Sequence, residues 1–286
     1  MWTVHASRKD NISFISQLIG SLKQNSIFKE YYYFDRLTST QDYAINLIKR
    51  KKTINPTIIL CNNQSKGRGR KGNLWSSKIG GIWMSFILEA NLNIELSFVF
   101  VMVSAISIYK TIEKETQLKP ELKWPNDIFI DGKKIAGILI DIETSMNNKC
   151  CIIIGMGINT NNDLDSTLLE IQNMEQCNYN VTTLKKELNN VEISNNFFLS
   201  KLINNINFFL LEIIKNSFNY QSIFSIYKEK IMNSKDKLKY TFYNNGNKFD
   251  GEIIDIEPNG SLLVKDRQKN KIIQISSTYN INPNQL

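Results

Sequence analysis

Histidine is nearly absent from this chain of 286 residues, which holds only His5. Nucleophilic mechanisms of the Ser-His-Asp or Cys-His type need an imidazole base, so any such mechanism here would depend on that one residue. The four cysteines, Cys61, Cys150, Cys151 and Cys177, form no C-x-x-C pair. We therefore expect no zinc site of the Cys/His kind and free thiols in a reducing compartment.

An export signal and a long apolar run are lacking as well. The N-terminal segment carries Arg8, Lys9 and Asp10 without a following apolar core. The longest nearly apolar run, 98–108, is too short to span a bilayer. We expect a cytoplasmic protein without membrane association. The net charge of +8 favours a polyanionic partner, but a solvated surface rich in lysine and asparagine carries the same balance.

The apolar pattern predicts an α+β fold in which a mixed sheet is flanked by helices. The Asn-rich segment 160–180 is expected to be a loop. Beyond about residue 233, short strands separated by turn-forming residues indicate a small SH3-like barrel. The predicted domains are 1–232 and 233–286. We expect strands at 31–34, 57–61, 82–88, 122–124, 128–130, 134–143, 151–154, 237–243, 249–256, 261–265 and 271–275. We expect helices at 12–22, 41–51, 98–115, 182–190 and 195–230.

The segment 64–75, QSKGRGRKGNLW, combines three glycines with four cations between Lys66 and Gly72. Glycines let a backbone fold tightly and aim its N–H groups at a ligand, and the cations indicate that this ligand is an anion. Gly67 and Gly72 have the spacing of a P-loop, but Asn73-Leu74 stand where Lys and Ser/Thr are required. A phosphate or carboxylate site is predicted, with an exposed basic turn as the alternative.

Two further clusters follow along the chain. The segment 123–127, KWPND, offers the oxygens of Asn126 and Asp127 at a strand break, which suit Mg²⁺ or form an Asx turn. The segment 133–139, KKIAGIL, begins an apolar strand with lysines that point into a pocket or into solvent. The segment 155–159, GMGIN, lacks the third glycine of a dinucleotide-binding fingerprint.

Taken in order, five segments resemble the motifs of the biotin–protein ligases. They are Ser39-Thr40-Gln41, 64–75, 123–127, 134–139 and 155–159. The resemblance implies a catalytic domain similar to class II aminoacyl-tRNA synthetases. It implies that biotin is activated with ATP and Mg²⁺ to biotinyl-5′-AMP, then transferred to a lysine of a biotin carboxyl carrier protein. About 30 N-terminal residues are too few for the DNA-binding domain of some relatives, so a short form without DNA binding, a monomer or homodimer, is expected.

The resemblance also implies roles for individual residues. Lys134 and Arg70 would be catalytic, and Asp127 would hold the metal. Gln41 stands where the family has Asn, and Asn73 where many members have Arg. The alternatives are a lipoate or octanoate ligase or transferase, a biotin-sensing repressor and an RNA-binding protein. Biotin would contact Ser39, Thr40, Gln41, Gln64, Gly67, Arg68, Gly69, Arg70, Lys134 and Gly137, and ATP would contact Arg70, Trp75, Asn126, Asp127, Lys134, Asn159, Thr182 and Thr183.

Overall fold

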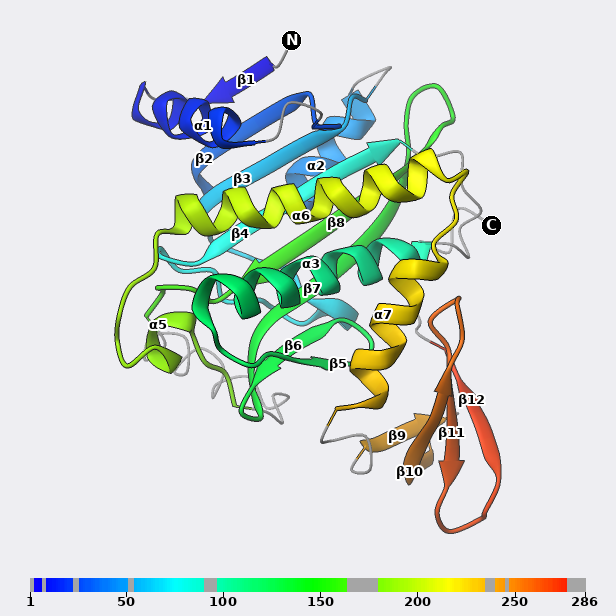
Figure 1. Ribbon diagram of the computed structural model, residues 1–286. Helices are drawn as coiled ribbons and strands as arrows, with labels where there is room; N and C mark the ends of the chain where they lie inside the picture. The colour runs from blue at the N-terminus through cyan, green and yellow to red at the C-terminus, as the bar shows by residue number, and fades with distance from the viewer. Residues whose placement is uncertain are drawn as a thin grey trace.

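A mixed sheet of eight strands forms the centre of the computed structural model (Figure 1), which describes residues 3–6, 9–22, 26–50, 54–89, 97–163, 180–234, 240–244 and 247–276. The strand order is β1-β2-β3-β4-β8-β7-β6-β5. The first three strands are parallel and the remaining pairs are antiparallel. The strands are β1 (Thr3–Ala6), β2 (Glu30–Leu37), β3 (Thr57–Gln64), β4 (Ile82–Glu89), β5 (Glu121–Lys123), β6 (Asp127–Ile130), β7 (Lys133–Thr144) and β8 (Cys150–Ile158).

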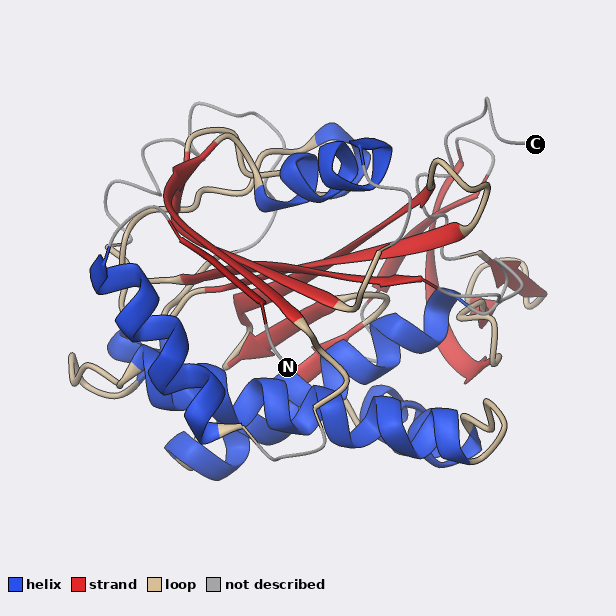
Figure 2. Ribbon diagram, turned by 90° about the horizontal axis from the view of Figure 1, so that it is seen from above, coloured by secondary structure: helices blue, strands red, loops and turns tan. Residues whose placement is uncertain are grey.

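Helices cover both faces of this sheet (Figures 1 and 2). Helices α1 (Lys9–Ser21), α3 (Phe98–Thr116), α6 (Asn195–Lys215) and α7 (Gln221–Met232) share one core with one face, and α2 (Thr40–Arg50) packs on the other. The central strands read as nearly continuous apolar runs because both of their faces are buried. Helix α6 has the length and composition of a membrane span, but it packs against α1 and α3 over the sheet.

A second, antiparallel sheet lies near the C-terminus, in the order β12-β11-β10-β9. Its strands are β9 (Tyr240–Asn244), β10 (Asn247–Ile256), β11 (Leu262–Asp266) and β12 (Ile272–Ile275). The indole Nε1 of Trp124 donates to the carbonyl of Gly260 at 2.8 Å, and Lys228 Nζ lies 2.6 Å from Asp255 Oδ1. The predicted α+β architecture is confirmed. The closed barrel and the boundary at residue 233 stay predictions.

The structure differs from the predicted elements at several places. The helix expected to fill 195–230 is two helices, α6 and α7, and between them Ser217 and Phe218 have left-handed φ angles of 54° and 63°. The strand β1 was not predicted, because four residues are too short to carry a periodic signal. The helix predicted at 182–190 is reduced to α5 (Leu184–Glu187). Asn189 and Asn190 have φ angles of 55° and 67°, and this left-handed conformation ends the helix. Of the predicted loop 160–180, residues 164–179 lie outside the described residues, together with Cys177.

Candidate active site

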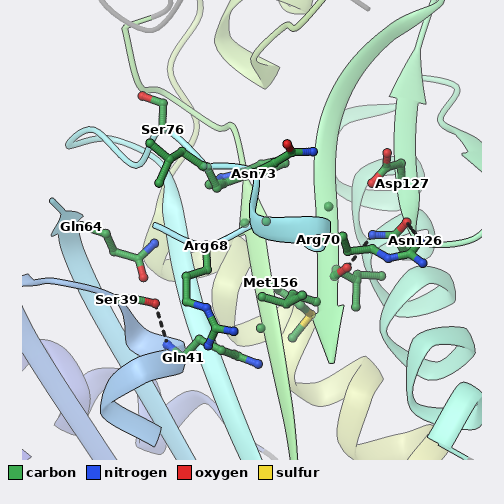
Figure 3. Close-up of a pocket in the computed structure, with 18 of the residues that line it drawn as sticks. Ser39, Gln41, Gln64, Arg68, Arg70, Asn73, Ser76, Asn126, Asp127 and Met156 are labelled. Atoms are coloured by element: carbon green, nitrogen blue, oxygen red, sulfur yellow. Dashed lines mark hydrogen bonds between the residues drawn. The ribbon is translucent and has the colours of Figure 1, made fainter. Parts of the chain in front are cut away.

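A cavity of about 300 Å³ brings together segments that lie far apart in the sequence. Its walls come from the start of α2, the glycine-rich loop, the strand break at 125–127 and facing stretches of β7 and β8. Figure 3 shows the loop crossing the cavity, with Ser39, Gln41 and Gln64 on one side and Asn126 and Asp127 on the other. All five segments singled out in the sequence contribute residues to the wall of this cavity. The fifth, 155–159, does so as part of β8.

Side chains satisfy the first backbone N–H groups of α2. Ser39 Oγ accepts from the N–H of Gln41 at 3.1 Å, as a helix cap does. Gln64 Oε1 accepts from the N–H of Thr40 at 2.7 Å, and Gln64 Nε2 donates to Ser77 Oγ at 2.7 Å. Gln64 therefore ties the start of the glycine-rich loop to the helix, which fixes the distance between two walls of the cavity.

Gln41 is held by the protein on both sides of its carboxamide. Its Oε1 accepts from Ser85 Oγ at 2.9 Å, and its Nε2 donates to the carbonyl of Ile153 at 3.3 Å. Ser85 also lies 2.8 Å from Thr40 Oγ1. Ser85 was not among the residues predicted from the sequence, although it is the only hydroxyl residue in the apolar run of β4. A buried polar residue inside such a run is a signal that could have found it.

The glycine-rich loop folds back on itself as a narrow ribbon. The N–H of Trp75 donates to the carbonyl of Gly67 at 2.8 Å, and Gly69 N–H donates to Asn73 O at 2.7 Å. A Cβ atom on Gly67 would lie 2.3 Å from the carbonyl oxygen of Trp75, so only glycine fits there. At the tip, Lys71 has a φ of 56°. The loop thus carries Arg68 and Arg70 on a defined backbone.

Arg70 and Lys134 meet at the other end of the cavity through two neighbouring residues. Arg70 Nη1 donates to Asn126 Oδ1 at 3.0 Å, and Lys134 Nζ lies 2.7 Å from Asp127 Oδ2. Asn126 is itself fixed, because its Nδ2 donates to the carbonyl of Ile138 at 2.6 Å. The second oxygen of Asp127 is buried and has no hydrogen-bond partner among the described residues. Two cations and an unsatisfied carboxylate oxygen therefore lie at one end of the cavity.

The indole of Trp75 packs against two glycines of the sheet. Gly137 and Gly157 are direct cross-strand partners, and Cβ atoms on them would lie 2.8 and 2.4 Å from the indole. Lys134 Nζ lies 5.1 Å from the centroid of this ring, within the range of a cation–π interaction. The indole Nε1 is buried and donates to no acceptor in the described part of the chain. An orphaned donor in a cavity wall indicates that a ligand supplies the acceptor.

Three predicted site residues do not line the cavity. Gly67 lines a neighbouring hollow on the other side of the loop. Thr182 donates to the carboxylate of Glu187, and Thr183 Oγ1 accepts from the N–H of Lys186 at 3.1 Å as the cap of α5. The other predicted residues, Ser39, Thr40, Gln41, Gln64, Arg68, Gly69, Arg70, Trp75, Asn126, Asp127, Lys134, Gly137 and Asn159, all line it.

The short helix α5 carries an acidic group, Glu187, whose pKa is shifted by its surroundings. Burial alone would raise the pKa of Glu187. The Lys133 ammonium, 2.6 Å away, and the hydroxyl of Thr182 outweigh burial and lower that pKa below its ordinary value. The ionised carboxylate therefore holds the segment around Val181, which does line the cavity, against β7.

The residues that form the cavity also resemble those of known proteins. Residues 33–159 match the profile of the Biotin/lipoate A/B protein ligase family. The match begins in β2 and ends at Asn159, so it contains every segment of the cavity wall except the one around Val181.

Proteins that resemble this chain in sequence include some named as biotin ligases. The bifunctional ligase/repressor BirA of Bacillus subtilis is 33% identical over 160 residues, which cover 54% of this chain and 49% of that protein. Biotin–protein ligase 2 of Arabidopsis thaliana is 27% identical over 177 residues, covering 59% of this chain and 53% of that protein. The chain thus spans about half the length of the curated relatives it matches.

Solved structures of biotin ligases share the fold over most of the chain. The biotin protein ligase of Aquifex aeolicus in complex with biotin and ATP superposes with a TM-score of 0.68 at 24% identity, covering 87% of this chain and 97% of that one. The Helicobacter pylori biotin acetyl coenzyme A carboxylase synthetase with bound biotinylated ATP gives a TM-score of 0.56 at 20% identity, covering 85% and 98%.

Proposed function

We propose that the chain is a biotin–protein ligase. It activates biotin with ATP to biotinyl-5′-AMP and pyrophosphate, then transfers biotin to a lysine of a biotin carboxyl carrier protein with release of AMP. The observation that carries the proposal is the convergence of Arg70 and Lys134 on one cavity, each held by one residue of the pair Asn126-Asp127. The named relatives support biotin as the acid that is activated.

The chemistry of such a reaction suits a site without a histidine. In the first step the carboxylate of biotin attacks the α-phosphate, so the substrate supplies its own nucleophile and no catalytic base is required. The protein must overcome the repulsion between two anions and stabilise the charge that develops on the phosphate. Arg70 and Lys134 perform this work together from one end of the cavity.

The two ends of the cavity are assigned to the two substrates. The Ser39–Gln41 end, with Gln64 and Arg68 beside it, offers polar groups on a largely buried wall and is assigned to the ureido ring of biotin. The other end is assigned to ATP, with Trp75 beside the base. The ATP end also includes Asn126, Asp127 and Asn159, while Thr182 and Thr183 support it from behind through Val181.

A magnesium ion fits the ATP end as a companion of the nucleotide. Asp127 Oδ1 is a buried carboxylate oxygen without a hydrogen-bond partner among the described residues, and it would be the protein ligand. Within the described ranges, no three Asp, Glu, Cys or His side chains are grouped so that they could hold a metal ion by themselves. Mg²⁺ commonly binds through one or two carboxylates plus substrate phosphates, and it would neutralise phosphate charge here.

The remaining features of the proposal follow from the family. Residues 1–232 act as the catalytic domain and 233–286 as a small SH3-like barrel. The enzyme works in the cytoplasm without DNA, as a monomer or homodimer, on a carrier protein. A lipoate or octanoate ligase is the alternative within the same family. Thermal-shift titrations with biotin and with lipoate separate the two, since only the true substrate should raise the melting temperature at micromolar concentration.

Lys134→Ala tests the proposal directly. It removes a cation from the α-phosphate site, and biotin-dependent exchange of pyrophosphate into ATP should fall far more than tenfold while biotin still binds. Lys149→Ala is the matched control, because this lysine pairs with Glu89 and does not line the cavity. Exchange that survives Lys134→Ala within tenfold, about 1.4 kcal/mol of barrier, refutes the proposed role.

A further inference from the structure

The guanidinium of Arg68 is bound by two carboxylates from different elements. Its Nη1 lies 3.1 Å from Asp42 Oδ1 on α2 and 2.9 Å from Asp141 Oδ2 on β7, and its Nη2 donates to Asp141 Oδ1 at 3.5 Å. Figure 3 shows the side chain reaching down from the glycine-rich loop toward Gln41. Neither Asp42 nor Asp141 was singled out in the sequence.

Asp141 is the unusual partner, because it is a carboxylate in the middle of a buried strand. The residue is 6% exposed, and its Oδ2 makes no hydrogen bond of good geometry in the described part of the chain. Arg68 is the one cation within ion-pair distance of it among the described residues. A buried charge that loses its only counter-ion is strongly unfavourable, so opening the loop would expose the protein to that penalty.

The charge of Arg68 is balanced within the protein. One guanidinium faces two carboxylates, so its charge is already neutralised by them. Arg68 is therefore poorly suited to attract an anionic ligand. Its two ion pairs instead join the glycine-rich loop to α2 and to β7, and this connection is called the strap below.

We propose that Asp42 and Asp141 are positioning residues that hold Arg68, and with it the loop, closed over the Gln41 end of the cavity. Given the proposed function, this strap slows the departure of bound biotin. Because Asp141 is buried and the side chain of Asp42 is 41% exposed, Asp141 carries most of the effect. The contribution of Asp42 is the one that salt screens.

Hydrogen exchange in the ligand-free protein tests the strap without reference to biotin. The amides of Gly69 and Trp75 are bonded within the loop ribbon and should be protected. Asp141→Asn should speed their exchange at least tenfold, and Asp42→Asn about threefold. Lys66→Gln is the matched control, because this exposed lysine of the same loop makes no ion pair within the described ranges, and it should leave the exchange unchanged.

Biotin dissociation and steady-state kinetics supply the functional readout. Asp141→Asn should raise the dissociation rate and the KM for biotin at least tenfold, more than it lowers kcat, and Arg68→Lys should keep part of the effect. If Asp141→Asn does not fold, Asp42→Asn at low and high salt replaces it, with an effect that shrinks as salt rises.

Several outcomes overturn the inference. Wild-type exchange of Gly69 and Trp75 at the rate of an unstructured peptide would show that no strap exists. Equal exchange in Asp141→Asn and wild type, or an equal effect of Lys66→Gln, would also refute it. Failure of biotin to bind any variant would instead remove the proposed function, while the exchange data would still decide whether the carboxylates hold the loop.

Discussion

Gly157→Ala should disturb Trp75 and, through it, the ATP end of the cavity. The added Cβ would lie 2.4 Å from the indole Nε1, whereas ordinary contacts begin near 3.4 Å, so the ring must move by about 1 Å. Gly137 is the cross-strand partner of Gly157, and a Cβ there would lie 2.8 Å from the same ring. The indole is therefore packed closely against both glycines. Overpacking of this kind costs about 1–3 kcal/mol.

If that free energy appears in nucleotide binding, the KM for ATP rises about 5- to 150-fold. Pyrophosphate exchange at varied ATP measures this change, and biotin affinity should stay within about twofold because the Gln41 end is untouched. Trp75→Phe removes the Nε1 edge of the ring, so the double variant should be less impaired than the sum of the single changes. Gly20→Ala in α1 is the control, since a Cβ there meets nothing within 4 Å.

An unchanged KM for ATP in a Gly157→Ala protein that melts normally would refute this reasoning. It would mean that Trp75 is free to leave the glycine pair without consequence for the nucleotide. A protein that melts at much lower temperature but keeps its KM would instead assign the glycines to folding alone. Tryptophan fluorescence during ATP titration separates these cases, because only a ligand-contacting indole should respond to the nucleotide.

Three further outcomes are expected. A Cβ on Gly155 would lie 2.6 Å from Gln41 Oε1, so Gly155→Ala should weaken biotin binding measured by calorimetry, and adding Gln41→Asn should restore part of it; additive effects would argue against contact. Burial raises the pKa of Cys61 to about 11 and that of Cys151 to about 12, so mass-mapped alkylation at pH 8 should label both only after denaturation; rapid native labelling would contradict this. Because the pKa of Glu187 is lowered when folded, its stabilisation is present above the unfolded value near 4.5 and lost as pH falls through the folded one; denaturant unfolding of wild type and Glu187→Gln should converge in acid, and a pH-independent difference would refute it.

Much of the cavity could be predicted because its parts are locally encoded. The glycines and cations of the loop, the pair Asn126-Asp127 and Lys134 each carry their chemistry in a short segment, and their order along the chain matches one family. The buried helix α3, Phe98–Thr116, could be predicted because its apolar run is long, and it ends one residue beyond the predicted range. Local pattern was sufficient in these cases.

The residues that were missed depend on pairing between distant strands. Asp141 is a charged residue inside an apolar run, and nothing near it in sequence indicates that Arg68 lies over it. Thr182 and Thr183 illustrate the opposite case, because a short likeness predicted contacts with ATP and the structure shows both hydroxyls hydrogen-bonded within the segment of α5. Their contact with ATP stays a prediction. Hydrogen bonds to near neighbours competed with the predicted role, as they often do for threonine.

The register of β7 against β8 explains why these features belong together. Gly137 pairs with Gly157, Leu139 with Gly155 and Asp141 with Ile153. Because side chains alternate along a strand, these odd-numbered positions share the face on which α2 and the glycine-rich loop lie. They successively support Trp75, Gln41 and Arg68.

The opposite face of the same two strands carries even-numbered apolar residues that pack under the helices α3 and α6. A slip of one residue would exchange the two faces, moving an apolar row into the cavity and the Asp141 carboxylate under the helices. Burial of these apolar residues under the helices therefore fixes the register of β7 against β8. That register places the base of Trp75, the wall behind Gln41 and the anchor of Arg68 at two-residue intervals along a single strand pair.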